Sequence, residues 1–264
     1  MTPTSASYAL GSTADSSTRE APLTSPGAVC AIHQPNLFPR LSTLAKLYAA
    51  DRWIVLDDVQ FARRDYQHRA RLASLTDPSD RQWLTVATHL PRGRPTLILE
   101  AQLAEPERCR RRVEQLVRQH YGRGQHWQAV QEVLEPVLDR FETTDRTADI
   151  AEVSALALLA ALGWRGEVLR SNDLPARKER SQRLADLAAA TGRSRYLCGT
   201  GGLRYLEAEP FAAQGVTVAP FRAPTSEGIW QSAHKVSVLR ALAAAGTHSL
   251  ADELRAVTAN LARA

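Results

Sequence analysis

Three groups of polar residues in this chain directly follow short apolar runs, where they could do chemistry. In the first group, His33 and Gln34 follow the run at 28–32 and precede Pro35. A histidine in this place could act as a general base or hydrogen-bond a developing negative charge. Because proline restricts the residue before it, the direction of Gln34 is held. The alternative interpretation of His33 is a turn residue that caps the run with a polar group.

The second group, within residues 57–69, places two carboxylates directly after an apolar run at 53–56. Asp57 and Asp58 could bind a metal, orient a histidine, or act as acid and base. Arginine suits bidentate recognition of phosphate or carboxylate, so the polar residues that follow could bind substrate. The candidates for substrate binding are Gln60, Tyr66, His68 and Arg69. The alternative is a solvated loop whose aspartates cap a helix.

The third group is a glycine-rich stretch after the apolar run at 195–198. It contains Gly199, Gly201 and Gly202, and Tyr205 follows shortly afterwards. Glycines at the end of a strand let the backbone approach a ligand closely, and their amides can hold an anion. We therefore count these four residues as candidates for substrate binding. A tight strand-to-helix turn would explain the same glycines.

Ser171 follows a further apolar run at 166–170 and could supply an oxygen ligand or a helix cap. No G-x-S-x-G motif surrounds it, so we do not interpret it as a hydrolase nucleophile. The glycine-rich stretch is neither G-x-G-x-x-G nor a P-loop, and the histidines lack H-E-x-x-H spacing. The sequence therefore names no metal and no cofactor.

The elements around the first two groups predict how these side chains are positioned. Residues 28–56 read as strand, loop, helix and strand, because helically spaced apolar residues at 41–50 separate two unbroken apolar runs. This order is typical of a βαβ unit in a parallel sheet, where ligands bind beyond the carboxyl ends of the strands. His33 lies at one such end, and Asp57 and Asp58 lie at the next. The sequence thus predicts an α/β fold with a parallel-sheet, Rossmann-like core.

The remaining pattern adds a mostly helical insert at about 104–163 and helices at the C-terminus. We expect helices at 105–121, 127–141, 147–163, 179–191, 234–245 and 249–260. We expect further strands at 82–88, 96–101, 166–170, 195–198 and 215–220.

Composition limits the class of protein. With 264 residues, 44% of them hydrophobic and 23% charged, the chain resembles an ordinary globular protein. We expect a disordered Ser/Thr-rich tail at 1–26 and one α/β domain at 27–264. The three cysteines lack C-x-x-C spacing, and no apolar run has transmembrane or secretory length, so we expect a cytoplasmic protein. The net charge of +5 permits an anionic or carrier-bound small-molecule substrate without requiring nucleic acid.

Together, the ordered motifs over roughly residues 28–222 resemble the WbqC-like protein family. The matching stretches are His33–Asn36 with Pro39, Leu56–Phe61, Tyr66, Arg69, Trp83–Val86, Tyr196–Gly199 with Gly201 and Tyr205, and Phe211 with Gly215 and Val216. The chain departs from the family at three motif positions. His68 stands where Asn is frequent, Arg170 replaces the first residue of a Ser-Ser pair, and Arg40 follows the loop proline in place of an aromatic or small residue.

The resemblance implies an enzyme of O-antigen sugar or specialised-metabolite biosynthesis. It suggests a transferase that moves an acyl or aminoacyl group onto an amine of a small molecule. In that scheme His33, Asp57 and Asp58 are the catalytic candidates, and Arg69 with the glycine amides holds an anion. Two alternatives remain: a nucleotidyltransferase-like enzyme, although H-x-G-H is absent, and a non-catalytic binding protein of the same pathway.

Overall fold

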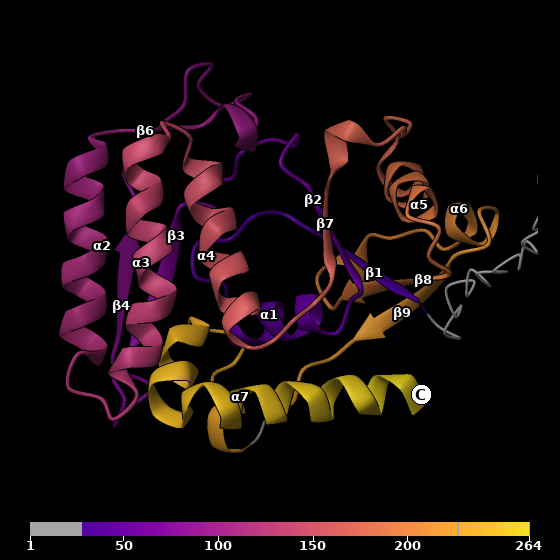
Figure 1. Cartoon of the computed structure of the whole chain (residues 1–264). Helices are drawn as coiled ribbons and strands as arrows, with labels where there is room; N and C mark the ends of the chain where they lie inside the picture. Colours follow the sequence, from indigo (N-terminus) through magenta and orange to yellow (C-terminus); the bar gives the residue numbers. More distant parts are fainter. Residues whose placement is uncertain (1–27, 226, 264) are drawn as a thin grey trace, which may run out of the picture.

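A five-stranded parallel sheet forms the centre of the computed structural model, which describes residues 28–225 and 227–263 (Figure 1). Its strands are β1 (Val29–His33), β2 (Arg52–Val55), β7 (Glu167–Arg170), β8 (Arg195–Gly199) and β9 (Thr217–Phe221). The strand order is β7-β2-β1-β8-β9, with β1 in the middle. The expected α/β, Rossmann-like class is therefore confirmed. The expected tail at 1–26 lies outside the described residues.

The direction of winding reverses at β1. From β1 the chain moves outward through β2 to β7, then returns to the other side of β1 for β8 and β9. The reversal point therefore lies between β1 and β8. Ligands of open α/β sheets bind in the crevice outside the carboxyl ends of the strands at such a point.

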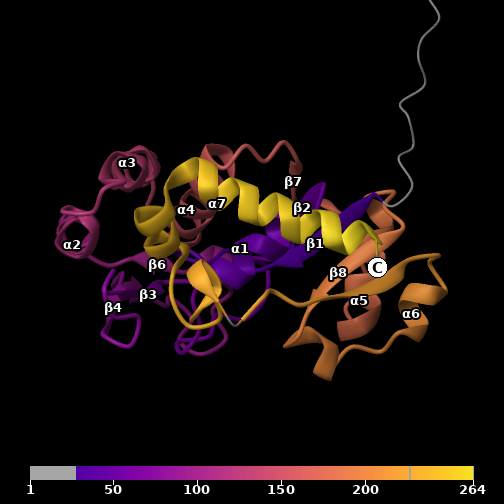
Figure 2. The same ribbon diagram turned by 90° about the horizontal axis from the view of Figure 1, so that it is seen from below.

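Helices cover both faces of the sheet because both faces are apolar. Alternate residues of β1 point to opposite faces, so Ala31 packs in one core cluster while Cys30 and Ile32 pack in another. Helices α1 (Leu41–Tyr48) and α7 (Val238–Arg263) lie on the first face. The second face carries α5 (Arg180–Ala190) and α6 (Glu209–Ala212), as Figures 1 and 2 show.

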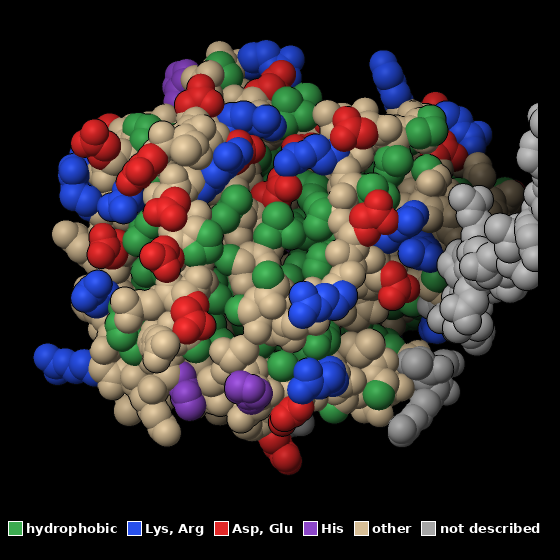
Figure 3. All heavy atoms as spheres, viewed as in Figure 1, with side chains coloured by type: hydrophobic (Ala, Val, Ile, Leu, Met, Phe, Trp, Pro, Cys, Tyr) green, Lys and Arg blue, Asp and Glu red, His purple; other side chains and the backbone are tan. Residues whose placement is uncertain are grey.

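The long connection between β2 and β7 begins with two small antiparallel sheets outside the main sheet. These pair β3 (Arg69–Ala73) with β4 (Arg81–Thr85), and β5 (Thr88–His89) with β6 (Gln102–Leu103). Three helices follow where helices were expected: α2 (Pro106–Tyr121), α3 (Trp127–Thr143) and α4 (Thr147–Ala161). Lys, Arg, Asp and Glu side chains are interspersed over α2 and α3 in Figure 3. Some arginines of α2 form ion pairs, for example Arg118 with Glu114.

Two local expectations need correction or refinement. The strand expected at 96–101 is wrong, because Ile98–Glu100 forms a short 3-10 helix. The Glu100 carboxylate accepts a hydrogen bond from the Leu97 backbone N–H (2.8 Å), which stabilises a turn where the apolar run suggested a strand. The two expected C-terminal helices correspond to α7, which begins at Val238 rather than at residue 234 and which Gly246 interrupts with φ 75° and ψ 173°. Among the described residues, no helix combines the length and apolar character needed to cross a bilayer.

Candidate functional site

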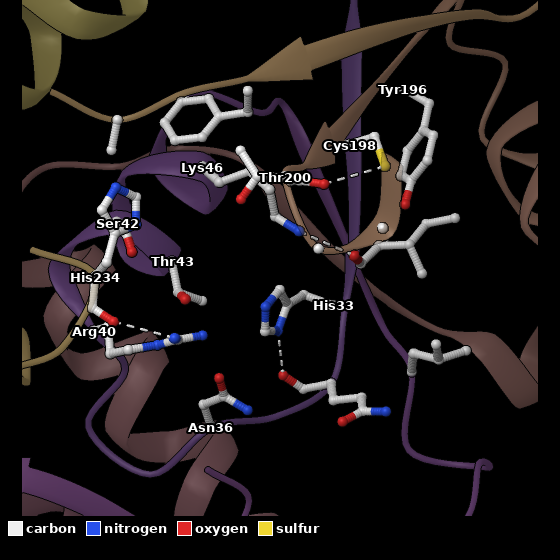
Figure 4. A pocket seen from close by; sticks show the side chains of 18 of the residues that line it. His33, Asn36, Arg40, Ser42, Thr43, Lys46, Tyr196, Cys198, Thr200 and His234 are labelled. Carbon is white, nitrogen blue, oxygen red and sulfur yellow. Dashed lines mark hydrogen bonds between the residues drawn. The ribbon is translucent and has the colours of Figure 1, made fainter. Parts of the chain in front are cut away.

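The two central strands separate before they end, and this separation opens a cavity. β1 stays paired with β2 as far as His33–Val55, but its pairing with β8 stops at Cys30–Tyr196. Beyond that point the Ile32 carbonyl accepts a hydrogen bond from Lys46 Nζ of α1 (3.3 Å). A cavity of about 440 Å³ lies here, within the range of small-molecule sites and at the winding reversal (Figure 4).

Polar groups from five parts of the chain line this cavity. They come from the end of β1 and the loop after it, from α1, from the loop after β2, from the glycine loop after β8, and from the segment before α7. The polar lining residues include His33, Gln34, Asn36, Arg40, Ser42, Thr43, Lys46, Asp65, Thr200 and His234.

His33 is held as a neutral imidazole, and one of its ring nitrogens has no hydrogen-bond partner among the described residues. Its Nδ1 lies 2.7 Å from the Gln34 carbonyl oxygen, which can only accept, so Nδ1 carries the proton. Burial, then the charges of Lys46 and Arg40, lower the pKa of His33 to about 3. At neutral pH Nε2 therefore has a lone pair. In Figure 4 the ring projects toward the space bounded by Arg40 and Lys46.

Lys46 is a buried cation that has no carboxylate partner in the part of the chain that the structure describes. The residue is only 6% exposed, and its Nζ donates a hydrogen bond to the Ile32 carbonyl. Burial and, to a smaller extent, the charge of Arg40 lower the pKa of Lys46 to about 8. Among the ion pairs of residues 28–225 and 227–263, none includes Lys46.

Arg40 is the second cation on the cavity wall. Its guanidinium donates to the His234 carbonyl (3.2 Å) and lies 4.2 Å from the centre of the Tyr66 ring. Its buried Nε has no hydrogen-bond partner within the described part of the chain. Asp65 brings a carboxylate to the lining, and its Oδ1 accepts the Tyr66 backbone N–H (2.8 Å).

The glycine loop forms the β8 side of the cavity. Gly199, Gly201 and Gly202 all line it, and the 3-10 helix Gly202–Arg204 follows. A Cβ atom at Gly202 would lie 2.8 Å from Cys198 Sγ, so the loop packs closely on the strand end only with glycine there. Burial raises the pKa of the Cys198 thiol, which keeps it protonated at neutral pH.

Asp57 and Asp58 lie at the same edge of the sheet but do not line the cavity. Arg170 donates to Asp57 Oδ2 (3.2 Å) and also pairs with Glu152 of α4 (2.9 Å). Burial raises the pKa of Asp57, partly offset by the charge of Arg170. Asp58 accepts a hydrogen bond from Ser171 Oγ (2.6 Å) and pairs with Arg183 of α5. The structure thus joins Asp57, Asp58 and Ser171 to neighbouring cations and hydroxyls on the β2–β7 side.

The other expected binding residues divide between the cavity and its surroundings. Gln34 lines the cavity, and its Oε1 accepts from Gln67 Nε2 (2.7 Å). Tyr66 touches the site through Arg40, whose guanidinium covers its ring. Gln60 is exposed and donates to the Arg94 carbonyl (2.7 Å).

Three expected residues have their contacts outside the cavity. His68 packs on Phe61 with ring centres 5.1 Å apart, and burial lowers its pKa to about 4. The Arg69 guanidinium lies 4.3 Å from the Trp83 ring centre, in the small β3–β4 sheet. Tyr205 is 66% exposed.

Sequence reasoning missed Arg40, Asn36, Thr43 and above all Lys46. The available signal for Lys46 was its place between Ala45 and Leu47, which are both buried in an apolar helix. A lysine amid core residues needs a special environment, because an unpaired buried charge is unfavourable. Arg40 stood out as a departure from the resemblance, without a role assigned to it.

Within the described ranges, no cluster of three or more His, Cys, Asp or Glu residues is arranged to hold a metal ion.

Comparison with known proteins gives one result. Neither the curated proteins nor the solved structures include a match to this chain. The model of the WbqC-like protein family matches residues 34–249, from the residue after His33 to the first turns beyond Gly246. The match includes the first turns of α1, the glycine loop and the segment before α7, and so nearly all of the cavity wall. By this match over most of its length, the chain belongs to the WbqC-like protein family.

Proposed function

We propose that this protein is a small-molecule transferase that moves an acyl or aminoacyl group onto an amine, with His33 as the proton acceptor. The observation that carries the proposal is the neutral His33 ring, whose Nδ1 is engaged by Gln34 and whose Nε2 is free beside the cavity. A free, oriented imidazole nitrogen is the group that general-base catalysis requires.

The proposed reaction is a nucleophilic substitution at an acyl carbon. The lone pair of the amine forms the new C–N bond, and the bond from the carbonyl carbon to the leaving group breaks. The amine proton passes to His33 Nε2, which then returns it to the leaving group. The enzyme supplies orientation within an enclosed site and donors for the developing oxyanion, in the manner of other acyl-transfer enzymes.

The size and place of the cavity support a small-molecule substrate. Its volume of about 440 Å³ fits a metabolite-sized ligand, and its place at the winding reversal is where α/β proteins bind such ligands. The resemblance to the family suggests an amine on an O-antigen sugar or a specialised metabolite.

Nucleotidyl transfer is a second candidate, favoured by the strand order. When the five strands are numbered along the chain, the order β7-β2-β1-β8-β9 is 3-2-1-4-5, which is the dinucleotide-binding order without its sixth strand. In this version, the two cations of the wall would hold a nucleotide phosphate.

A substrate panel distinguishes the two candidates. The purified protein is incubated with acyl thioesters, aminoacyl adenylates and nucleoside triphosphates, each with amino sugars and simple amines, and products are identified by mass spectrometry. We expect an amide product, and at least tenfold less of it from His33→Asn. A nucleotidylated product would favour the second candidate, and unchanged amide formation by folded His33→Asn would overturn the role of His33.

A further inference from the structure

We propose that Arg40 and Lys46 form a subsite for an anionic group of the substrate, a phosphate or a carboxylate. The inference rests on the proposed function for the identity of the cavity as the substrate site. It assigns the substrate charge to Arg40, which precedes α1, and to Lys46 in the last turn of α1, whereas the sequence pointed to Arg69.

The first support is the state of Lys46. Lys46 is only 6% exposed, and a buried ammonium group would ordinarily have a carboxylate partner, because burying an unpaired charge is unfavourable. Within the described residues, its one hydrogen-bond partner is the Ile32 carbonyl, at 3.3 Å. An ammonium group has three donors, so this contact leaves donor capacity for a ligand.

The second support is the position of Arg40. Arg40 and Lys46 line the same cavity, and Figure 4 shows both side chains extending toward the space before His33. The hydroxyls of Ser42, Thr43 and Thr200 also belong to the wall and can donate to an oxyanion. The Tyr66 ring and the His234 carbonyl hold the guanidinium, so less freedom is lost when an anion binds.

The charge balance of the wall favours an anion. Its two cations face a single carboxylate, Asp65, which lies beyond ion-pair distance of either within the described structure. His33 is neutral and the Cys198 thiol is protonated. An anionic group would therefore complete a site that holds excess positive charge.

The size of the cavity indicates that the anion is part of a larger molecule. A bare phosphate would leave most of the 440 Å³ unfilled. Apolar side chains, among them Leu56, Leu184 and Phe221, form other parts of the wall and suit an organic body. The substrate would thus place its anion at α1 and its body against these apolar side chains.

The subsite also links binding to the basicity of His33. The charges of Lys46 and Arg40 help to lower the pKa of His33, after burial. A bound anion would offset both charges, so the pKa of His33 rises toward its ordinary value when substrate is present. The base becomes stronger only when the site is occupied.

The test uses inorganic phosphate, pyrophosphate and acetate as separate probes of the full-length protein. Affinity is measured by calorimetry at low salt, and the titration of His33 is followed by NMR. We expect at least one probe to bind and to raise the pKa of His33. The stronger binder tells phosphate from carboxylate.

Variants connect the binding to the two cations. We expect Lys46→Met and Arg40→Met each to weaken the best probe at least tenfold. Arg71→Met removes a cation that covers Trp83 outside the cavity, and it should bind as the wild type does. Having two variants keeps the test valid if one fails to fold. Two results would overturn the subsite. One is that none of the three probes binds, and the other is that folded Lys46→Met and Arg40→Met both bind the probe as tightly as the wild type does.

The outcomes separate this inference from the proposed function. Anion binding that needs Arg40 and Lys46, without amide formation, would keep the subsite and reject the transferase. His33-dependent amide formation that Lys46→Met and Arg40→Met leave unchanged would keep the transferase and reject the subsite.

Discussion

The two halves of the carboxyl edge of the sheet differ in whether their charged residues form ion pairs. On the β2–β7 side, Arg170 joins Asp57 and Glu152, and Asp58 bonds with Ser171 and Arg183. On the β1–β8 side, Lys46 and Arg40 have no carboxylate partner among the described residues and face a cavity. Both sides place polar groups directly after apolar strands, so their sequences look alike.

The difference teaches that a charge at a strand end indicates a ligand only when the fold leaves it unpaired. Arg170 comes from β7, far along the chain from Asp57, and its guanidinium joins Asp57 to Glu152 of α4. These partners hold the insert against the sheet. Near β1, by contrast, the separation of β8 leaves room for a ligand and brings no carboxylate to Lys46.

The largest expected effect is on turnover, and it could break the comparison. With the donor and amine found by the substrate panel, we expect His33→Asn to lower kcat by about 100- to 10,000-fold. Asp58→Asn keeps the hydrogen-bonding shape beside Ser171, so its loss should stay below about tenfold. Steady-state kinetics of both variants provide the measurement. An equal loss in Asp58→Asn would make the paired side part of the catalytic site.

The second effect is on stability and contrasts Arg170→Met with Lys46→Met. Loss of Arg170 leaves Asp57 and Glu152 buried without their cation, and we expect a loss of about 2–4 kcal/mol in the free energy of unfolding. This lies toward the lower part of the range for buried pairs because the Arg170 side chain is 37% exposed.

Lys46→Met removes an unpaired buried charge, so we expect little change or a gain of about 1 kcal/mol. Urea unfolding at pH 7 measures the free energy of unfolding of both variants. The comparison requires that their m-values equal that of the wild type. Burial raises the pKa of both Asp57 and Glu152, so the Arg170→Met defect should shrink as the pH falls and these groups become neutral. A loss in Lys46→Met as large as in Arg170→Met would contradict the contrast.

The third effect is a pH dependence of stability. The pKa of His33 is about 3 in the folded protein and about 6.5 for an ordinary histidine. Between these values the unfolded chain binds a proton that the folded protein does not, so stability falls as the pH drops from about 6.5 to 3. His33→Asn should flatten this slope by up to about 1.4 kcal/mol per pH unit.

His68 provides the internal control for the NMR titration of His33 in the presence of an anion. Its pKa is also lowered, to about 4, but it packs against Phe61 away from the cavity. A binding anion should therefore shift the NMR titration of His33 and leave that of His68 in place. Equal shifts of both would mean that the anion acts at a distance, without occupying the cavity.

The smallest expected effect compares two adjacent glycines of the cavity wall. A Cβ at Gly202 would meet Cys198 Sγ at 2.8 Å, whereas a Cβ at Gly201 would meet nothing within 4 Å. We expect Gly202→Ala to lower stability by about 1 kcal/mol and to weaken anion binding severalfold. Gly201→Ala should do neither. Identical behaviour of the two in urea unfolding and calorimetry would show that the loop has freedom to move.

The sequence alone predicted the α/β class, because the spacing of apolar residues and the length of each apolar run identify β1, α1 and β2 from local sequence. Residues 28–56 alternate between unbroken apolar strands and a helix with an apolar face, and burial follows that pattern. The strand expected at 96–101 failed because Glu100 bonds to the Leu97 N–H, a contact that hydrophobicity does not encode.

The sequence also placed His33 at the carboxyl end of a central strand, since strand ends are visible where an apolar run meets proline and polar residues. Only the tertiary structure decided which charges are free. Asp57 lies next to Asp58 in the chain, yet it pairs with Arg170, which is distant in sequence and also pairs with Glu152. Lys46 looks like a solvent-exposed helical residue until α1 packs on the sheet and buries its amine against Ile32. Pairing depends on distances between segments that the chain brings together only when it folds, and local sequence carries no record of them.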